Sequence, residues 1–346
     1  MKNRTAAALL GLAALSFGAG PVAAQITAPA APVPAGITVD SITVHGTSLE
    51  GNLEGNSADR NVLVVLPPSY GKSKTRRYPV VYFLHGFMID ARNFYNYLHV
   101  PEAAAHAAEK GDEFIIVVPD SDTKQGGSMY SSSVTTGDFE AFVAKDLVHY
   151  IDAHYRTIAK RSARGLAGHS MGGYGVWKIG MDYPQMWSSI YAMSACCVSA
   201  RTETVASAEK LASVPFDAAA KADFGTRAGL ASAVAWSPAP DKPPYYAEFP
   251  VKDGALDNRV LAEWAANSPL AMVPQHVWDL KSFTAIGADV GDKDGLLKDD
   301  TAIHDALTRF GIKHEWAVYS GTHTSAIAQR FDTIVLPFFA RHLAMK

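Results

Sequence analysis

The sequence has few cysteines, no surplus of positive charge and, beyond its first residues, no long apolar run. Its 346 residues include only two cysteines, Cys196 and Cys197, and because these are adjacent they cannot join distant segments. We expect two buried thiols at the end of a strand rather than a strained vicinal disulfide. With 48% hydrophobic residues, the chain can instead bury a full apolar core.

The charge balance and hydropathy exclude two classes of partner. Lys and Arg number 31 against 34 Asp and Glu, which gives a formal net charge of -3. A nucleic-acid-binding surface needs a surplus of basic residues, so none is expected. No later segment has the roughly 20 consecutive apolar residues that a membrane helix needs. Small molecules or neutral polymers such as carbohydrates are the expected partners.

The N-terminus has the pattern of a targeting segment. Lys2 and Arg4 precede the apolar stretch 6–17, and small residues at 22–24 form a cleavage site, so we expect a signal peptide at 1–24. The Pro- and Ala-rich residues 25–36 are expected to form a flexible or extended leader. The sequence therefore predicts an exported protein, periplasmic or secreted.

From residue 37 the apolar pattern indicates an α/β fold. Residues 37–66 alternate apolar and polar positions in two stretches, which is typical of antiparallel strands. Further along, helical stretches separate six continuously apolar runs: PVVYFLHG, EFIIVVPD, ARGLAGHS, SSIYAMSA, SFTAIGAD and HEWAVYSG. Continuously apolar strands are buried on both faces. We therefore expect a mostly parallel, doubly wound sheet with antiparallel N-terminal strands, in one domain over 37–346.

One interval interrupts this alternation. Residues 199–275 contain no strong strand but many aromatic residues and a Pro-rich stretch, SPAPDKPPYYAEFP. We expect an insertion that caps the carboxyl edge of the sheet, where ligands bind in such folds.

The stretch GHSMGG at 168–173 carries the clearest chemical signal. It lies between a predicted buried strand and a predicted helix, the context required of a nucleophile elbow. The glycines allow a tight turn from which Ser170 projects, and the first amides of the helix point to the same place. We expect Ser170 to be a nucleophile.

A serine hydroxyl needs a histidine to accept its proton and a carboxylate to orient that histidine. His323 in GTHT follows the last predicted strand and is the expected general base. The acid should lie on the loop after the preceding strand, which offers Asp289, Asp292 and Asp294. Asp294 is favoured, with Asp289 second, because several residues of loop are needed to bring the carboxylate to the histidine.

Two backbone amides should bind the oxyanion of an acyl-transfer reaction. One is the amide of Met171, which directly follows the nucleophile. The other is the amide of Phe87, in the loop after the strand that ends at His85 and Gly86. His85 is expected to brace this loop.

These motifs together resemble the esterase family of α/β-hydrolases that includes esterase D, feruloyl and acetylxylan esterases and the mycobacterial mycolyltransferases. The resemblance covers roughly residues 37–345 and rests on YFLHG, GHSMGG, GDKD and GTHT. It implies the α/β-hydrolase fold, a triad of Ser170, Asp294 and His323, and Tyr130 as a residue of the pocket. Little of the region 199–275 can be matched to the family, so no substrate preference is carried over.

The sequence thus predicts an exported serine esterase that hydrolyses carboxylic esters, including feruloyl or acetyl esters of carbohydrates. Trp236 is a further candidate for stacking on an aromatic acyl group or a sugar. An acyltransferase of the mycolyltransferase type, which uses the same acyl-enzyme, is the alternative. A non-catalytic binding module of the same fold is the third hypothesis. No metal or cofactor is expected, because a triad supplies nucleophile, base and electrostatics by itself.

Overall fold

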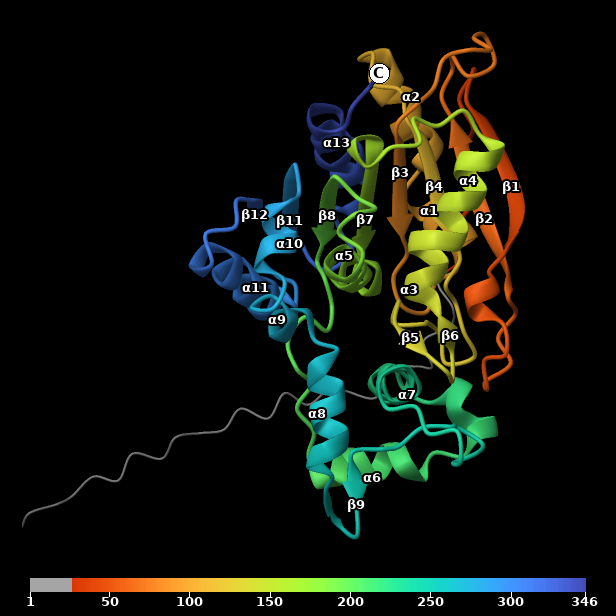
Figure 1. Cartoon of the computed structure of the whole chain (residues 1–346). Coiled ribbons are helices and arrows are strands. Elements are labelled where there is room, and N and C mark those ends of the chain that lie inside the picture. The colour runs from red at the N-terminus through yellow and green to blue at the C-terminus, as the bar shows by residue number, and fades with distance from the viewer. Residues whose placement is uncertain (1–26) are drawn as a thin grey trace, which may run out of the picture.

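The computed structural model describes residues 27–346 (Figure 1). The signal peptide predicted at 1–24 and the first two residues of the leader lie outside the described residues. The remainder of the leader, up to Gly36, forms no helix or strand. It is bonded to the body of the protein, since the amides of Ala28 and Ala31 donate to the side-chain oxygens of Asn93 and Asn96, at 3.0 and 3.2 Å.

The core of the fold is a sheet of eight strands in the order β1-β2-β4-β3-β7-β8-β11-β12. The strands are β1 (Thr38–His45), β2 (Asp59–Leu66), β3 (Val80–Leu84), β4 (Ile115–Pro119), β7 (Arg164–His169), β8 (Ser189–Met193), β11 (Ala285–Gly291) and β12 (Glu315–Tyr319). Only the β1–β2 and β2–β4 pairs are antiparallel, and the other pairs of this sheet are parallel. The mostly parallel sheet with antiparallel N-terminal strands is confirmed.

The connections place a topological switch point beside β3. From β3 the chain first moves to β4 on one side and later to β7 on the other. Loops that leave the carboxyl ends of β3 and β7 therefore diverge, and ligands bind in the crevice that such loops form. Gly86 and Ser170, which follow these two strands, lie at this point.

Helices cover both faces of the sheet, which explains the continuously apolar strands. In β3 and β4 every residue is buried, and successive side chains enter opposite cores, as for Tyr82 and Phe83. One face carries α1 (Ala91–Tyr97), α2 (Val100–Glu109), α12 (Ile327–Arg330) and α13 (Leu336–His342). The other carries α3 (Phe139–Ala141), α4 (Val148–His154), α5 (Met171–Asp182) and α11 (Leu297–Arg309).

The last strand differs from its prediction. β12 has the apolar run EWAVY, yet none of its residues is fully buried and Val318 is 49% exposed. β12 is the edge strand of the sheet and has only one neighbour, so less of its surface is covered.

The segment between β8 and β11, which contains the expected cap, is mostly helical. Its elements are α6 (Val205–Ser213), α7 (Phe224–Trp236), β9 (Val251–Lys252), β10 (Ala255–Leu256), α8 (Asn258–Ala266), α9 (Pro269–Met272) and α10 (Val277–Lys281). Figure 1 shows α6, α7 and α8 beyond the end of the sheet toward which the parallel strands point, next to the short hairpin of β5 (Ser132–Ser133) and β6 (Gly137–Asp138).

This segment shares a core with the sheet domain. The Trp236 ring lies 5.7 Å from that of Tyr174 on α5 and 6.2 Å from that of Trp264 on α8. The indole of Trp236 donates to Ser131 Oγ at 3.0 Å, and the Tyr174 hydroxyl donates to the carbonyl of Asn267 at 2.8 Å. Side chains of α5 thus fix the insertion in place.

The two cysteines follow β8 as half-buried free thiols. Their sulfur atoms lie 2.9 Å apart, and the Cys197 thiol donates to Cys196.

Among residues 27–346, no helix is long and apolar enough to cross a membrane.

Candidate active site

Ser170 occupies the turn between β7 and α5 in a conformation that few non-glycine residues adopt. Its φ is 57° and its ψ is -116°, and such conformations cost of order 1–3 kcal/mol. Backbone bonds hold it there: its amide donates to Met193 O, and its carbonyl accepts from the amides of Tyr174 and Cys196, each at 3.0 Å. The surrounding fold therefore imposes the turn.

The glycines around Ser170 are required by close backbone approach. A Cβ on Gly168 would lie 2.4 Å from the carbonyl carbon of Gly172, and a Cβ on Gly172 would lie 2.0 Å from Leu84 O. Neither contact is possible without moving main chain. The glycines of the G-x-S-x-G motif are thus required because the backbones of β7, α5 and the end of β3 meet there.

The structure brings together the three side chains predicted as the triad. His323 Nε2 lies 2.9 Å from Ser170 Oγ, and His323 Nδ1 lies 2.8 Å from Asp294 Oδ2. Because a carboxylate only accepts hydrogen bonds, Nδ1 carries the proton and Nε2 is free to accept from the serine hydroxyl.

Asp294 is placed to remain ionised although it is buried. Its second oxygen, Oδ1, accepts from the amide of Leu296 at 2.9 Å. Desolvation raises the pKa of Asp294, but the hydrogen bonds from His323 and Leu296 outweigh it and hold the pKa below its ordinary value. The carboxylate is therefore charged at neutral pH.

The two competing aspartates have other partners. Asp289 is fully buried in β11, where its Oδ2 binds Arg330 at 2.7 Å and accepts from the Tyr191 hydroxyl at 2.8 Å. Asp292 Oδ1 accepts from the amide of Gly321, in the loop that carries His323, at 2.9 Å. Of the three aspartates, Asp294 is the one that bonds to His323.

Phe87 and Met171 lie close to each other and to Ser170. Gly86 is so close that a Cβ there would be 3.5 Å from Ser170 Cβ, and a Cβ on Gly127 would meet both Met171 Sδ and Phe87 Cδ2 within 2.9 Å. Within the described part of the chain, no group accepts a hydrogen bond from the amide of Phe87 or of Met171. Both amides are available to a ligand.

His85 braces the loop of Phe87, as expected. Its Nε2 accepts from the amide of Ser121 at 2.8 Å, so the proton is on Nδ1, which donates to Gly86 O at 2.8 Å. The ring is fully buried and thereby ties this loop to the end of β4.

His169 makes a contact that the sequence did not reveal. Its Nε2 donates to the backbone carbonyl of His323 at 2.8 Å, and the two rings lie 4.7 Å apart. Burial, together with the nearby His323, lowers the pKa of His169 to about 3, so the ring is neutral. It occupies the variable position before the nucleophile, where no motif predicts a partner 154 residues later.

A cavity of about 450 Å³ opens next to Ser170 and His323. It is lined by Gly86, Phe87, Ile89, Phe94, Tyr97, His169, Ser170, Phe224, His323, Thr324 and Ile327. Its size is that of a small-molecule site, and most of these side chains are apolar.

The two residues predicted to contact substrate do not line this cavity. Tyr130 is fully buried below α5, where its hydroxyl donates to His85 O at 3.2 Å, and Trp236 is in the core between α5 and α8. Both predictions of a substrate contact are wrong, because aromatic residues near a site are as readily used for packing. Tyr130 instead bonds to the backbone of His85, and the indole of Trp236 donates to Ser131 Oγ.

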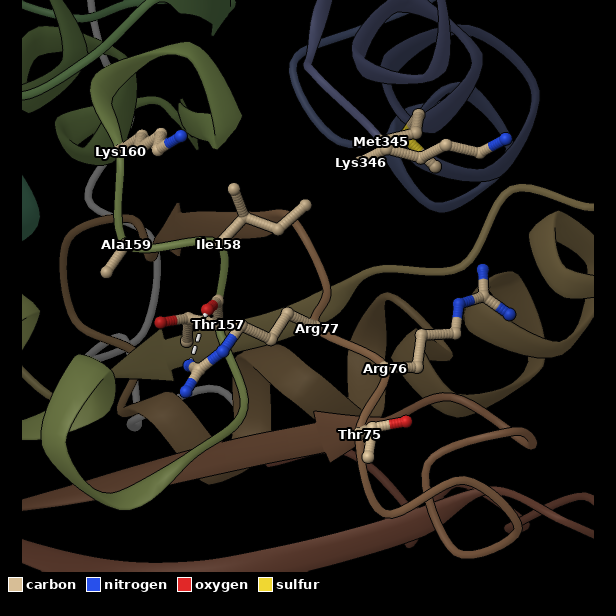
Figure 2. A pocket seen from close by; sticks show the side chains of 9 residues that line it. All are labelled: Thr75, Arg76, Arg77, Thr157, Ile158, Ala159, Lys160, Met345 and Lys346. Carbon is tan, nitrogen blue, oxygen red and sulfur yellow. Dashed lines mark hydrogen bonds between the residues drawn. The ribbon is translucent and has the colours of Figure 1, made fainter.

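A wider hollow of about 790 Å³ lies at the opposite edge of the sheet (Figure 2). Its residues 75–77 precede β3 and its residues 157–160 precede β7, so it is at the amino ends of the parallel strands. Arg77 donates to Thr157 O at 3.0 Å there, and Arg76 pairs with Glu113. Among the described residues that line this hollow, no nucleophile faces a base.

No group of three or more His, Cys, Asp or Glu side chains within 27–346 is arranged to hold a metal ion.

Solved structures with the same architecture define the class of fold. A ferulic acid esterase superposes with a TM-score of 0.63 at 24% identity, covering 89% of this chain and 98% of that one. An S-formylglutathione hydrolase from Agrobacterium tumefaciens superposes with a TM-score of 0.60 at 17% identity, covering 90% and 98%. The chain has the α/β-hydrolase fold.

Sequence comparison then gives the family. The model of the esterase family, described as "Putative esterase", matches residues 56–327, and the chain belongs to that family. Esterase Rv1288 of Mycobacterium tuberculosis (strain ATCC 25618 / H37Rv) is 35% identical over 130 residues, which are 35% of this chain and 26% of that protein. The match spans about a quarter of this curated relative. Family and fold together place the chain among the α/β-hydrolases of the esterase family.

Proposed function

We propose that the protein is an exported serine esterase that cleaves carboxylic esters through an acyl-enzyme on Ser170. The observation that carries the proposal is the hydrogen-bonded series Ser170–His323–Asp294, with distances of 2.9 and 2.8 Å. Its geometry supplies nucleophile, general base and orienting acid in the order that acyl transfer requires.

In the first half of the reaction, Ser170 Oγ attacks the ester carbonyl while its proton passes to His323 Nε2. The carbonyl oxygen gains negative charge and is held by the amides of Phe87 and Met171, each worth roughly 10²- to 10³-fold in rate. His323 then gives the proton to the leaving alcohol. Asp294 stabilises the imidazolium that forms in between.

In the second half, water enters where the alcohol left. His323 removes a proton from this water, the resulting hydroxide attacks the acyl carbon, and the proton returns to Ser170 as the acid leaves. His169 positions His323 throughout by holding its backbone carbonyl, so the imidazole meets the serine from a fixed loop.

For the substrates we propose acyl esters of carbohydrates outside the cytoplasm, with feruloyl and acetyl groups as the first candidates. Three features support this: the export pattern of residues 1–24, the apolar cavity beside Ser170, and the architectural similarity to a ferulic acid esterase. Protein isolated from the producing cells is expected to begin at Gln25. A chain recovered from the cytoplasm with Met1 still present would contradict export.

The catalytic proposal is tested with p-nitrophenyl acetate, p-nitrophenyl octanoate and methyl ferulate. The wild type should hydrolyse at least one, and Ser170→Ala should lose at least about 10³-fold in kcat. Adding an alcohol such as glycerol distinguishes hydrolysis from transfer, since a hydrolase forms mainly the free acid. Equal rates of ester hydrolysis by the wild type and Ser170→Ala would contradict the proposal that Ser170 is the nucleophile.

A further inference from the structure

One side chain of the insertion reaches the cavity beside the nucleophile. Phe224 is the first residue of α7, and Asp223 fixes the start of that helix by accepting from the amide of Thr226 at 3.0 Å. The Phe224 ring lines the cavity together with Ser170 and His323, yet it is 58% exposed. An exposed aromatic ring at the rim of an apolar cavity is a surface that a ligand can cover.

Phe224 also contacts the loop that carries one of the oxyanion amides. Its ring meets that of Phe87 edge-to-face, with centroids 5.7 Å apart and planes at 80°. This is a favourable geometry for two aromatic rings, and it holds the Phe224 ring against the loop of Phe87. The insertion and the oxyanion loop thus form one wall of the cavity.

The chemistry of the lining decides which part of an ester enters. Apart from Ser170, the two histidines and Thr324, the lining side chains are apolar or already bonded, since the Tyr97 hydroxyl donates to Thr324 O at 2.9 Å. None of the described residues that line the cavity is Lys, Arg, Asp or Glu. A sugar buried here would leave hydroxyl groups without partners, at a cost of about 1–3 kcal/mol each. An apolar acyl group has no such cost.

We propose that Phe224 is a specificity-determining residue that selects apolar acyl groups larger than acetyl. This inference rests on the proposed esterase function and, of the two candidate acyl groups named there, favours the larger aromatic one over acetyl. An acyl chain or ring that extends past Ser170 covers the exposed face of Phe224, whereas an acetyl group is too short to reach it. The insertion between β8 and β11 thereby sets the substrate range of this chain.

The test compares p-nitrophenyl octanoate and p-nitrophenyl cinnamate with p-nitrophenyl acetate, so that the leaving group stays constant. Phe224→Ala should lower kcat/KM for the two larger esters by roughly tenfold and change the acetate value less than threefold. Phe224→Leu keeps an apolar side chain, so its kcat/KM for the octanoate ester should lie between those of the wild type and Phe224→Ala. Trp278→Ala is the matched control, because Trp278 is an aromatic residue on α10, 82% exposed and outside the cavity.

Two outcomes would overturn the inference: an unchanged ratio of large to small esters in Phe224→Ala, or a ratio that rises because the ring only obstructs entry. If the wild type cleaves no ester, the proposed function fails, and binding then tests the inference separately. Methyl cinnamate should bind Ser170→Ala with a Kd roughly tenfold lower than it binds the Ser170→Ala, Phe224→Ala double variant. Equal Kd values would refute the role of Phe224.

Discussion

Replacing Asp294 by asparagine tests the triad without changing the shape of the side chain. In the wild type, Oδ1 accepts from the Leu296 amide and Oδ2 accepts from His323 Nδ1. An asparagine side chain has only one oxygen, and the Leu296 amide can only donate. In Asp294→Asn, this oxygen is therefore expected to face Leu296, and the new NH2 group to face His323.

This orientation reverses the tautomer of His323. With an NH2 group opposite it, Nδ1 must accept, so the ring proton moves to Nε2, which then cannot take the proton of Ser170. The imidazolium also loses its counter-charge. We expect kcat to fall by about 10³- to 10⁴-fold, equivalent to about 4–5 kcal/mol of transition-state stabilisation at 1.36 kcal/mol per tenfold.

The assay is hydrolysis of p-nitrophenyl acetate at pH 7.5 by the wild type, Asp294→Asn and Asp289→Asn. Asp289 is the matched control: it is also a buried carboxylate near the end of β11, but its partners are Arg330 and Tyr191. Asp289→Asn should lower Tm, because Arg330 loses its counter-charge, while the folded fraction keeps kcat within about tenfold. Asp294 is not the acid of the triad if Asp294→Asn stays within tenfold of wild type, or if Asp289→Asn shows the larger loss of kcat.

Three further predictions concern packing, positioning and pH. Gly172→Ala places a Cβ 2.0 Å from Leu84 O and should lower the free energy of unfolding by about 3 kcal/mol in urea titrations; an unchanged midpoint would contradict the packing argument. His169→Ala removes the donor to His323 O and should reduce kcat about tenfold, with partial recovery in His169→Gln; equal activity in all three proteins would exclude a positioning role. The folded-state pKa of Asp294 is below its unfolded value of about 4, so its contribution to stability is present above pH 4 and disappears as pH falls through the folded pKa. The stability difference between wild type and Asp294→Asn should accordingly shrink from pH 7 to pH 3 in urea titrations, and a difference that grows toward acid would contradict this sign.

The sheet could be predicted because its signal is local. Each of the six apolar runs overlaps one strand of the main sheet, namely β3, β4, β7, β8, β11 and β12 in chain order, since burial on two faces leaves a continuous apolar pattern in the chain itself. The exposure of β12 was missed because the position of a strand within the sheet depends on the order of all strands. An edge strand with an apolar sequence looks like a central one.

The candidate site could be predicted only where a motif fixes the backbone. Ser170 lies in a turn whose glycines are dictated by steric contact, and His323 and Asp294 follow strands whose ends converge. The pair His169–His323, by contrast, joins a variable motif position to a distant carbonyl. Tyr130 was assigned to the pocket from the family resemblance and Trp236 from its residue type, and neither ground distinguishes a stacking surface from core. Phe224 lies in an insertion without a recognisable pattern.

The role of Ser170 as nucleophile is tested by identifying the residue that becomes covalently modified. The protein is incubated with a p-nitrophenyl alkylphosphonate, which reacts with an activated serine and cannot be deacylated readily, and is then digested and analysed by mass spectrometry. We expect one adduct, on the peptide that contains Ser170, absent in Ser170→Ala and strongly reduced in His323→Ala. An adduct on another residue, or labelling that does not depend on His323, would contradict it.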